Sequence, residues 1–125
     1  IVVTPIQMIR AFSSVINGGN LMRPYIVKAI NTGASTQTVK PKLDKKIYSE
    51  KTSEIMRKML VSTVERGEYK WVKPEGYKIG GKTGTAQIAV GGRYDTSKTI
   101  ASFIGFAPAE KPKFIALVVL KEPKS

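Results

Sequence analysis

Apolar side chains recur at helical spacing in two stretches of the chain. The first stretch begins at Thr4, which can cap a helix, with Pro5 suited to the first helical position and Gln7 placed to complete a capping box. The glycine pair at residues 18–19 favours a helix end, and the apolar positions before it are Met8, Ile9, Phe12, Val15 and Ile16. This pattern predicts an amphipathic helix of about 14 residues, counted from the cap to the glycines.

The second helical pattern begins near Ser49, a residue suited to capping, with Glu50 in the first turn. It ends at Gly67, and its apolar stripe consists of Ile55, Met56, Met59, Leu60 and Val64. Between the two helices, residues 22–30 are predicted to be extended, and Pro24 favours an edge position there. The polar residues 31–46 predict a loop or a weak hairpin.

The C-terminal half of the chain changes to a β pattern. After a loop over residues 68–76, the sequence predicts strands at residues 78–90, 99–107 and 113–120. A glycine pair at residues 91–92 predicts a hairpin turn, and residues 108–112 predict a second turn. Short connections join antiparallel strands, so two helices followed by this meander predict an α+β fold.

Composition narrows the chemistry that the chain can perform. The 125 residues are enough for one domain, and they include no His and no Cys. Serine–histidine catalysis, thiol catalysis, disulfides and metal sites built on these ligands are therefore excluded, and we predict no metal and no cofactor. The longest apolar run, residues 114–120, is too short to span a bilayer. The chain opens without Met or a signal peptide, which predicts that it is part of a longer protein.

The charge of the chain admits two interpretations. The formal net charge is +12, from 21 Lys and Arg against 9 Asp and Glu. Such an excess is typical of a basic module that binds a polyanion, but the Lys residues are spread and not clustered, which favours a Lys-rich solvated face whose compensating acids lie elsewhere in a longer chain. The densest stretch, residues 40–46, holds four Lys but no aromatic residue to stack on bases, so we predict no nucleic-acid partner.

Residues 76–83 satisfy the phosphate-loop pattern Gly-x-x-x-x-Gly-Lys-Thr letter for letter. A phosphate loop needs a buried strand before it and a helix that begins at its Lys-Thr pair. Pro74 precedes this segment, and Gly84 and a β-like run follow it, so neither requirement is met. We therefore interpret the segment as the beginning of a strand.

In a strand that runs from Ile79 onward, Lys82 and Gly84 share one face, while Thr83 and Thr85 share the other. A twist or a bulge could turn the Lys and the hydroxyls toward one cleft. An edge strand offers free N–H groups to a peptide-like ligand, and a cation beside two hydroxyls suits a carboxylate. An ordinary glycine-containing strand fits the same pattern.

Residues 80–87 read Gly-Gly-Lys-Thr-Gly-Thr-Ala-Gln, which resembles the third active-site motif of the penicillin-binding proteins and serine β-lactamases. Residues 4–8 and residues 102–108 also resemble the transpeptidase branch of that family: they read Thr-Pro-Ile-Gln-Met and Ser-Phe-Ile-Gly-Phe-Ala-Pro. The three segments occur in family order, and the resemblance that they define extends along essentially the whole chain. The chain is most similar to the class B, monofunctional transpeptidases of division and elongation.

The resemblance implies an activity and a role for each matched residue. In this family a serine attacks the peptide bond between two terminal D-alanines of a peptidoglycan stem peptide. An amine of a neighbouring peptidoglycan strand then releases the acyl group from the enzyme and forms a cross-link. β-Lactams mimic the D-alanyl-D-alanine end. By resemblance, Lys82 supplies positive potential and serves the proton relay, and the hydroxyls of Thr83 and Thr85 hold a carboxylate. The N–H of Thr85 is an oxyanion donor, Gly84 lets the ligand approach the backbone, and Gln87 lines the acceptor side.

Two motifs of the family are absent from the chain. No Ser is followed three residues later by Lys, and no Ser-x-Asn occurs. Both motifs normally lie upstream, so residues 1–125 are predicted to be the C-terminal portion of a single transpeptidase domain. That portion is predicted to be inactive alone, to need the missing N-terminal part, and to act at the extracytoplasmic face of the bacterial membrane through an anchor outside this chain.

The resemblance also predicts an incomplete sheet. The family sheet has five strands and a terminal helix, so residues 114–120 would here form an uncovered hydrophobic edge that self-associates. The predicted partners are peptidoglycan stem peptides and β-lactam antibiotics. A D,D-carboxypeptidase or a β-lactamase-like hydrolase is the alternative within the family; no Asp or Glu is placed to serve as a deacylating base, so a transpeptidase is favoured.

Overall fold

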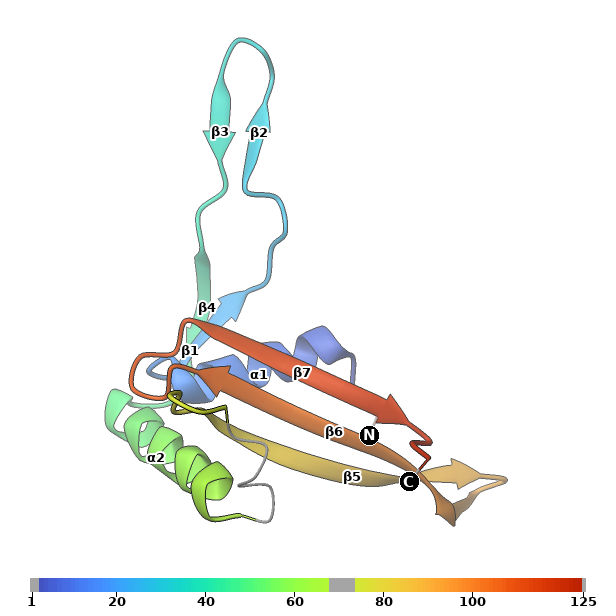
Figure 1. Ribbon diagram of the computed structural model, residues 1–125. Coiled ribbons are helices and arrows are strands. Elements are labelled where there is room, and N and C mark those ends of the chain that lie inside the picture. Colours follow the sequence, from blue (N-terminus) through green and yellow to red (C-terminus); the bar gives the residue numbers. More distant parts are fainter. Residues whose placement is uncertain (1–2, 68–73, 125) are drawn as a thin grey trace. The chain divides into compact units, whose positions relative to one another are not determined.

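The computed structural model describes residues 3–67 and 74–124. The chain divides into two compact units, Ile1–Ile55 and Met56–Ser125. Helix α1 and four short strands belong to the first unit, and a three-stranded sheet forms the body of the second (Figure 1). The predicted α+β class is confirmed. No helix among the described residues is long and apolar enough to cross a membrane.

Helix α1 covers Pro5–Ile16 and begins as the sequence predicts. The Gln7 N–H donates to Thr4 Oγ1 at 3.3 Å, and the Thr4 N–H donates to Gln7 Oε1 at 2.8 Å, so the capping box is closed in both directions. The helix ends at Asn17, and the glycines at 18 and 19 follow with φ of 85° and 88°. These positive angles explain why glycine stands at the stop.

Two small antiparallel ladders follow in the first unit. Strand β1 (Asn20–Arg23) pairs with β4 (Lys42–Lys46), and β2 (Ala29–Asn31) pairs with β3 (Thr36–Thr38). A hairpin is therefore present, but it begins at Ala29, before the predicted residues 31–46, and it ends at Thr38, with a turn that contains Gly33 at φ 81°. Residues 42–46 pair with β1 instead. The single extended piece predicted for residues 22–30 is wrong. It is divided into the end of β1 and the beginning of β2, because Pro24 lies just past β1 and has no N–H to continue the ladder.

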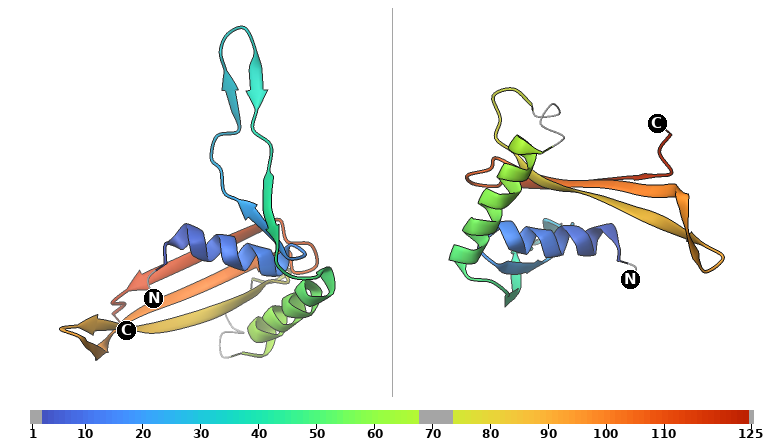
Figure 2. Two further views of the ribbon diagram at one scale, coloured as in Figure 1. Left: turned by 180° about the vertical axis from the view of Figure 1, so that it is seen from behind. Right: turned by 90° about the horizontal axis from the view of Figure 1, so that it is seen from below.

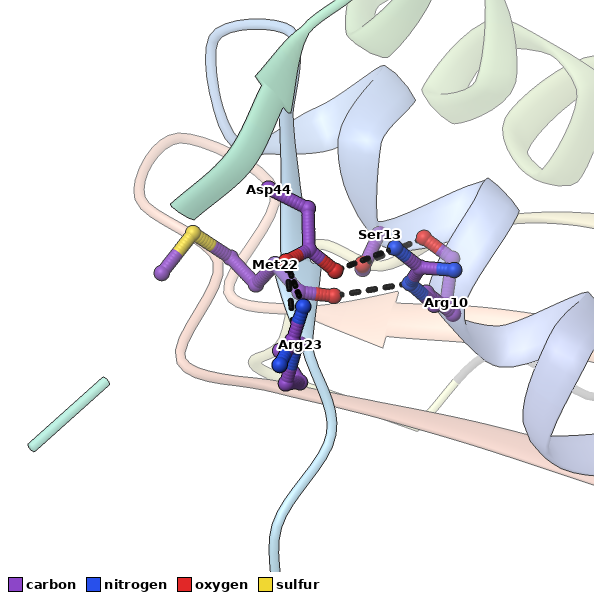
Figure 3. A network of polar contacts seen from close by, with 5 residues as sticks. All are labelled: Arg10, Ser13, Met22, Arg23 and Asp44. Atoms are coloured by element: carbon purple, nitrogen blue, oxygen red, sulfur yellow. Dashed lines mark hydrogen bonds and ion pairs between the residues drawn. The ribbon is translucent and has the colours of Figure 1, made fainter. Parts of the chain in front are cut away.

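Asp44 joins the first of these ladders to α1 (Figure 3). The Arg10 Nη2 lies 2.6 Å from Asp44 Oδ2, and the Arg23 Nη2 lies 2.8 Å from Asp44 Oδ1. Arg10 Nε also donates to the Met22 carbonyl oxygen at 2.9 Å. The hydrogen bond from Arg23, followed by the charges of Arg23, Arg10 and Lys42, lowers the pKa of Asp44 below its ordinary value of 3.8.

Helix α2 covers Glu50–Arg66, and Ser49 caps it by accepting the Thr52 N–H at 3.1 Å. Gly67 ends the helix, as predicted, and donates its N–H to the Thr63 carbonyl oxygen at 3.0 Å. The predicted apolar stripe is only partly buried. Leu60 and Val64, one turn apart, are buried, whereas the other three predicted members are exposed: Ile55, Met56 and Met59. The stripe predicted from the sequence is wider than the face of the helix that is covered.

The second unit contains the antiparallel meander β5 (Gly80–Val90), β6 (Arg93–Ala107) and β7 (Phe114–Lys121). Figure 2 shows the three strands side by side, with β6 between the other two. The predicted turn at residues 91–92 is confirmed, since both glycines have positive φ, 58° and 80°. Of the loop predicted over residues 68–76, residues 68–73 lie outside the described residues.

Strand β6 begins at Arg93 instead of Thr99, which corrects the predicted boundary. Gln87 pairs with Thr99 and Ile88 pairs with Asp95, so residues 96–98 have no partner on β5 and form a bulge. Asp95 Oδ1 accepts the Ser97 N–H at 2.8 Å and the Ser97 hydroxyl at 2.6 Å. This polar turn within the strand hides its first part from the alternation pattern. The same two hydrogen bonds lower the pKa of Asp95.

Candidate functional site

The five residues singled out by the sequence lie on one strand, β5. Lys82, Gly84, Thr85 and Gln87 are exposed, and Thr83 is half-buried. Residues 80–87 pair with β6 in unbroken antiparallel register. Side chains therefore alternate, with Lys82 and Gly84 on one face and Thr83 and Thr85 on the other. The bulge lies after Gln87, so it does not turn Lys82 and the two hydroxyls toward one face.

Strand β5 has an open edge within the described part of the chain. It pairs with β6 along one side and with no described strand along the other. The backbone groups on that side can pair with an extended ligand, as edge strands do. Because a strand and not a helix begins at residue 80 and continues through Lys82 and Thr83, the phosphate-loop interpretation of residues 76–83 does not hold.

Aromatic rings from β6 fill the space above the glycines of β5. A Cβ added to Gly80 would collide with the Phe106 ring, and one added to Gly81 would lie 2.6 Å from Phe103 Cζ and 2.7 Å from the Ile104 carbonyl oxygen. The Phe103 ring also lies over Gly105, where an added Cβ would be 2.6 Å from Cε1. These close approaches require glycine, and the rings replace the side chains that glycine lacks.

Gly84 is held from the neighbouring strand by Ser102. The Ser102 hydroxyl donates to the Gly84 carbonyl oxygen at 3.3 Å, and the two residues are direct partners in the ladder. A Cβ on Gly84 would lie 2.9 Å from Ser102 Oγ. The sequence predicts a strand at residues 99–107 and a family resemblance at residues 102–108, but it assigns no role at the site to Ser102. Phe106 pairs with Gly80, but Phe103 pairs with Thr83, so these contacts depend on the register between the strands and not on a signal within either segment.

The Lys82 ammonium group donates to the Thr83 carbonyl oxygen at 2.9 Å. Lys82 forms no ion pair with any residue that the structure describes. Its charge is therefore not neutralised by a neighbouring acid, and it is available to an anionic group brought to the open edge.

The Thr83 face of the sheet forms the floor of a groove of about 400 Å³. Cross-strand rows build this floor: Thr83 pairs with Phe103 and Phe103 with Val118, while Thr85 pairs with Ala101 and Ala101 with Leu120. Helix α2 contributes Thr63 and Val64 to the lining. The groove is apolar apart from a few hydroxyl groups, so it suits hydrocarbon better than charge.

The described residues include no group of three or more His, Cys, Asp or Glu that could hold a metal ion. Residues 3–67 and 74–124 also contain no Ser-x-x-Lys sequence, so the candidate site has a binding edge and a cation without a nucleophile of that kind. The arrangement thus offers an unpaired strand edge and a cation without an ion-pair partner among the described residues.

Known proteins resemble this chain over its full length. The family model described as "Penicillin binding protein transpeptidase domain" matches residues 1–125. Stage V sporulation protein D of Bacillus subtilis is 44% identical over an alignment of 125 positions, which covers 98% of this chain and 19% of that protein. A probable peptidoglycan D,D-transpeptidase PenA of Neisseria meningitidis is 37% identical over 94% of this chain and 19% of that protein. The chain thus spans about a fifth of the length of these curated relatives.

Solved structures give the same result. Penicillin-binding protein 2X of Streptococcus thermophilus superposes with a TM-score of 0.89 at 27% identity, over 98% of this chain and 20% of that one. Penicillin-binding protein A of M. tuberculosis, solved as an imipenem acyl-enzyme complex, superposes with a TM-score of 0.79 at 26% identity, over 98% of this chain and 27% of that one. The fold, the order of the motifs and the match along the whole chain lead to one conclusion: this chain belongs to the penicillin-binding protein transpeptidase domain family.

Proposed function

We propose that this chain is the C-terminal portion of a peptidoglycan D,D-transpeptidase domain and forms the substrate-binding wall of its active site. The observation that carries the proposal is the open edge of β5, where Lys82, Thr83 and Thr85 follow one another on a strand in regular register. A stem peptide that ends in D-alanyl-D-alanine is extended and carries a terminal carboxylate. It would pair with the free edge and place its carboxylate near the cation and the hydroxyls.

Each site residue then has a role in acyl transfer. Lys82 contributes positive potential and a proton-transfer path, and the hydroxyls of Thr83 and Thr85 hold the carboxylate of the stem peptide or of a β-lactam. The Thr85 N–H stabilises the oxyanion, a role that is worth roughly 3–4 kcal/mol of barrier in other enzymes. Gly84 leaves room for the ligand backbone, and Gln87 lines the side from which the acceptor amine arrives.

The attacking serine and its general base belong, in this proposal, to the N-terminal part of the same domain. The chain alone then forms no acyl-enzyme, since Lys82 has no serine to assist. The complete protein would act at the extracytoplasmic face of the membrane in division or elongation. The imipenem acyl-enzyme of the M. tuberculosis neighbour supports β-lactams as ligands. A hydrolase of the same family remains the second candidate, and the acceptor that releases the acyl group separates the two.

Covalent labelling of a longer protein that contains this chain, using a fluorescent penicillin, tests the proposal. We expect Lys82→Ala to slow labelling by roughly a hundredfold, as loss of a proton-transfer group does. Lys78→Ala is the matched control, because Lys78 is exposed and lies before β5. Its Nζ is 3.8 Å from Glu110 Oε1. It should label at the rate of the unaltered protein. Labelling of the 125-residue chain by itself, or normal labelling of Lys82→Ala, would contradict the proposal.

A further inference from the structure

A projecting arm of the first unit carries a surface that the proposed active site does not use. We define the arm as residues 24–41, which contain β2 and β3. Between the β1–β4 ladder and the β2–β3 ladder, residues 24–28 and 39–41 belong to no strand. Figures 1 and 2 show the two chain segments bowing apart between the ladders.

Three consecutive large side chains of the arm are exposed. Tyr25 is 48% exposed, Ile26 is 100% exposed and Val27 is 54% exposed, and Ile30 follows at 51%. A single exposed apolar side chain is ordinary, but a contiguous group that includes a fully exposed isoleucine marks an interaction surface.

The backbone beside these side chains is also unpaired. The Val39 N–H donates to the Lys28 carbonyl oxygen at 2.9 Å, which closes the lower end of the β2–β3 ladder. Within the described part of the chain, no backbone hydrogen bond involves Tyr25, Ile26 or Val27. Free N–H and C=O groups next to apolar side chains are what an incoming strand requires.

The charge of the arm indicates that its partner is negatively charged. Its charged residues are Lys28 and Lys40, and it has no Asp or Glu. Neither ammonium group makes an ion pair with a described residue, and the nearby Asp44 is bound by Arg10 and Arg23. Lys28 directly follows the exposed segment, and Lys40 lies across from it next to Val39, whose N–H is bonded to Lys28, so a ligand with acidic groups at this end would gain two contacts without displacing any.

We propose that the arm binds an acidic, apolar segment of another protein, which pairs as a strand with Tyr25–Val27 and places its carboxylates near Lys28 and Lys40. Two cations are too few for binding to an anionic lipid surface or to a nucleic acid. Polybasic lipid-binding segments use about 4–8 Lys or Arg, and nucleic-acid binding proteins typically make about 6–10 phosphate contacts. The unpaired peptide groups likewise favour a peptide over a lipid surface.

The test uses two labelled peptides, one alternating Val and Glu and one alternating Val and Lys, with binding to the chain measured by fluorescence anisotropy. We expect the Glu peptide to bind and the Lys peptide to bind at least tenfold more weakly. The double variant Lys28→Glu/Lys40→Glu should reverse this preference. Lys111→Glu, an exposed substitution in the second unit, makes the same kind of charge change outside the arm and should leave the preference unchanged.

Two further measurements make the proposal falsifiable. Ile26→Ser removes a fully exposed side chain, so it should weaken peptide binding at least fivefold with no change in the melting curve. Amide hydrogen exchange at residues 25–27 should slow when the Glu peptide is added. Equal binding of both peptides to all variants, or unchanged exchange at these amides, would overturn the proposal. So would binding to phosphatidylglycerol vesicles that is lost in Ile26→Ser while the peptides do not bind.

Discussion

The Ser102 hydroxyl holds the Gly84 carbonyl oxygen at 3.3 Å, and the same oxygen atom of Ser102 lies 2.9 Å from where a Gly84 Cβ would be. The serine thus supports β5 at this point, and its hydroxyl is the atom that a side chain at position 84 would crowd. It supports the strand that carries the proposed site, and it also lines the groove.

This relationship predicts a non-additive pair of substitutions. Gly84→Ala should destabilise the chain by about 1–3 kcal/mol, because the added methyl group meets Ser102 Oγ. Ser102→Ala alone should cost about 1 kcal/mol, the usual net worth of one hydrogen bond. The double variant should be more stable than the sum of the single effects predicts, since the clash is removed with the hydroxyl. Urea unfolding of the unaltered chain, the two single variants and the double variant measures the coupling. Strict additivity would show that Ser102 Oγ and the added methyl group at position 84 do not meet.

Ser53 should be the most costly serine of α2 to replace. It is 1% exposed; its hydroxyl donates to the Val15 carbonyl oxygen at 2.6 Å and accepts the Gly18 N–H at 2.9 Å. Ser53→Ala leaves both backbone groups without that partner, and we expect a loss of about 2 kcal/mol in the free energy of unfolding. Ser62→Ala on the same helix is the control, because the Ser62 side chain makes no hydrogen bond with any residue in the described part of the chain. Equal effects of the two substitutions would argue against this role.

Asp44 predicts a dependence of stability on acid pH. Its pKa in the folded chain is lowered below 3.8, chiefly by the Arg23 hydrogen bond. A carboxyl group with a lowered pKa stabilises the folded state fully above its unfolded pKa, and loses that contribution as the pH falls through the folded value. The difference in stability between the unaltered chain and Asp44→Asn should therefore be constant near neutral pH and shrink below about pH 3.8. A difference that stays constant down to pH 2 would contradict the ion pairs at this residue.

The free edge of β7 predicts self-association of the chain. Phe114, Val118, Val119 and Leu120 are between 49% and 65% exposed, and β7 pairs only with β6 among the described strands. Val119→Lys should shift the chain toward monomer in sedimentation velocity, because a charged side chain opposes edge-to-edge pairing. Lys113→Ala, just before the strand, is the control and should sediment like the unaltered chain. A monomeric unaltered chain with cooperative melting would show that the exposed edge does not associate.

Local signals explain why most elements could be predicted. The Thr4–Gln7 capping box, the cap at Ser49 and the glycine pair at residues 91–92 each specify a backbone conformation through their own chemistry, so the helix starts and the hairpin turn were found. The errors lie where distant contacts decide. The division of residues 22–30 depends on pairing with residues 36–46, and the early start of β6 depends on a bulge opposite β5.

The candidate site divides in the same way. Lys82, Thr83 and Thr85 could be identified by resemblance, because they are contiguous and their order is distinctive. The support provided by Ser102, Phe103 and Phe106 could not be foreseen from β5 alone, because it depends on the register between two strands. The catalytic and binding roles of Lys82, Thr83 and Thr85 stay predictions, which labelling of Lys82→Ala tests.

The rings that lie over Gly80 and Gly81 have a consequence for how this segment can change over time. A larger residue at either position is excluded by a specific phenyl group on the adjacent strand, and a smaller residue at Phe103 or Phe106 would open a void above a glycine. A substitution at a glycine of β5 is therefore tolerated only together with a compensating substitution at the facing phenylalanine of β6. Sequence variants of this segment should therefore co-vary across the β5–β6 ladder, and a homologue with an altered glycine pair should carry a smaller side chain at the matching ring.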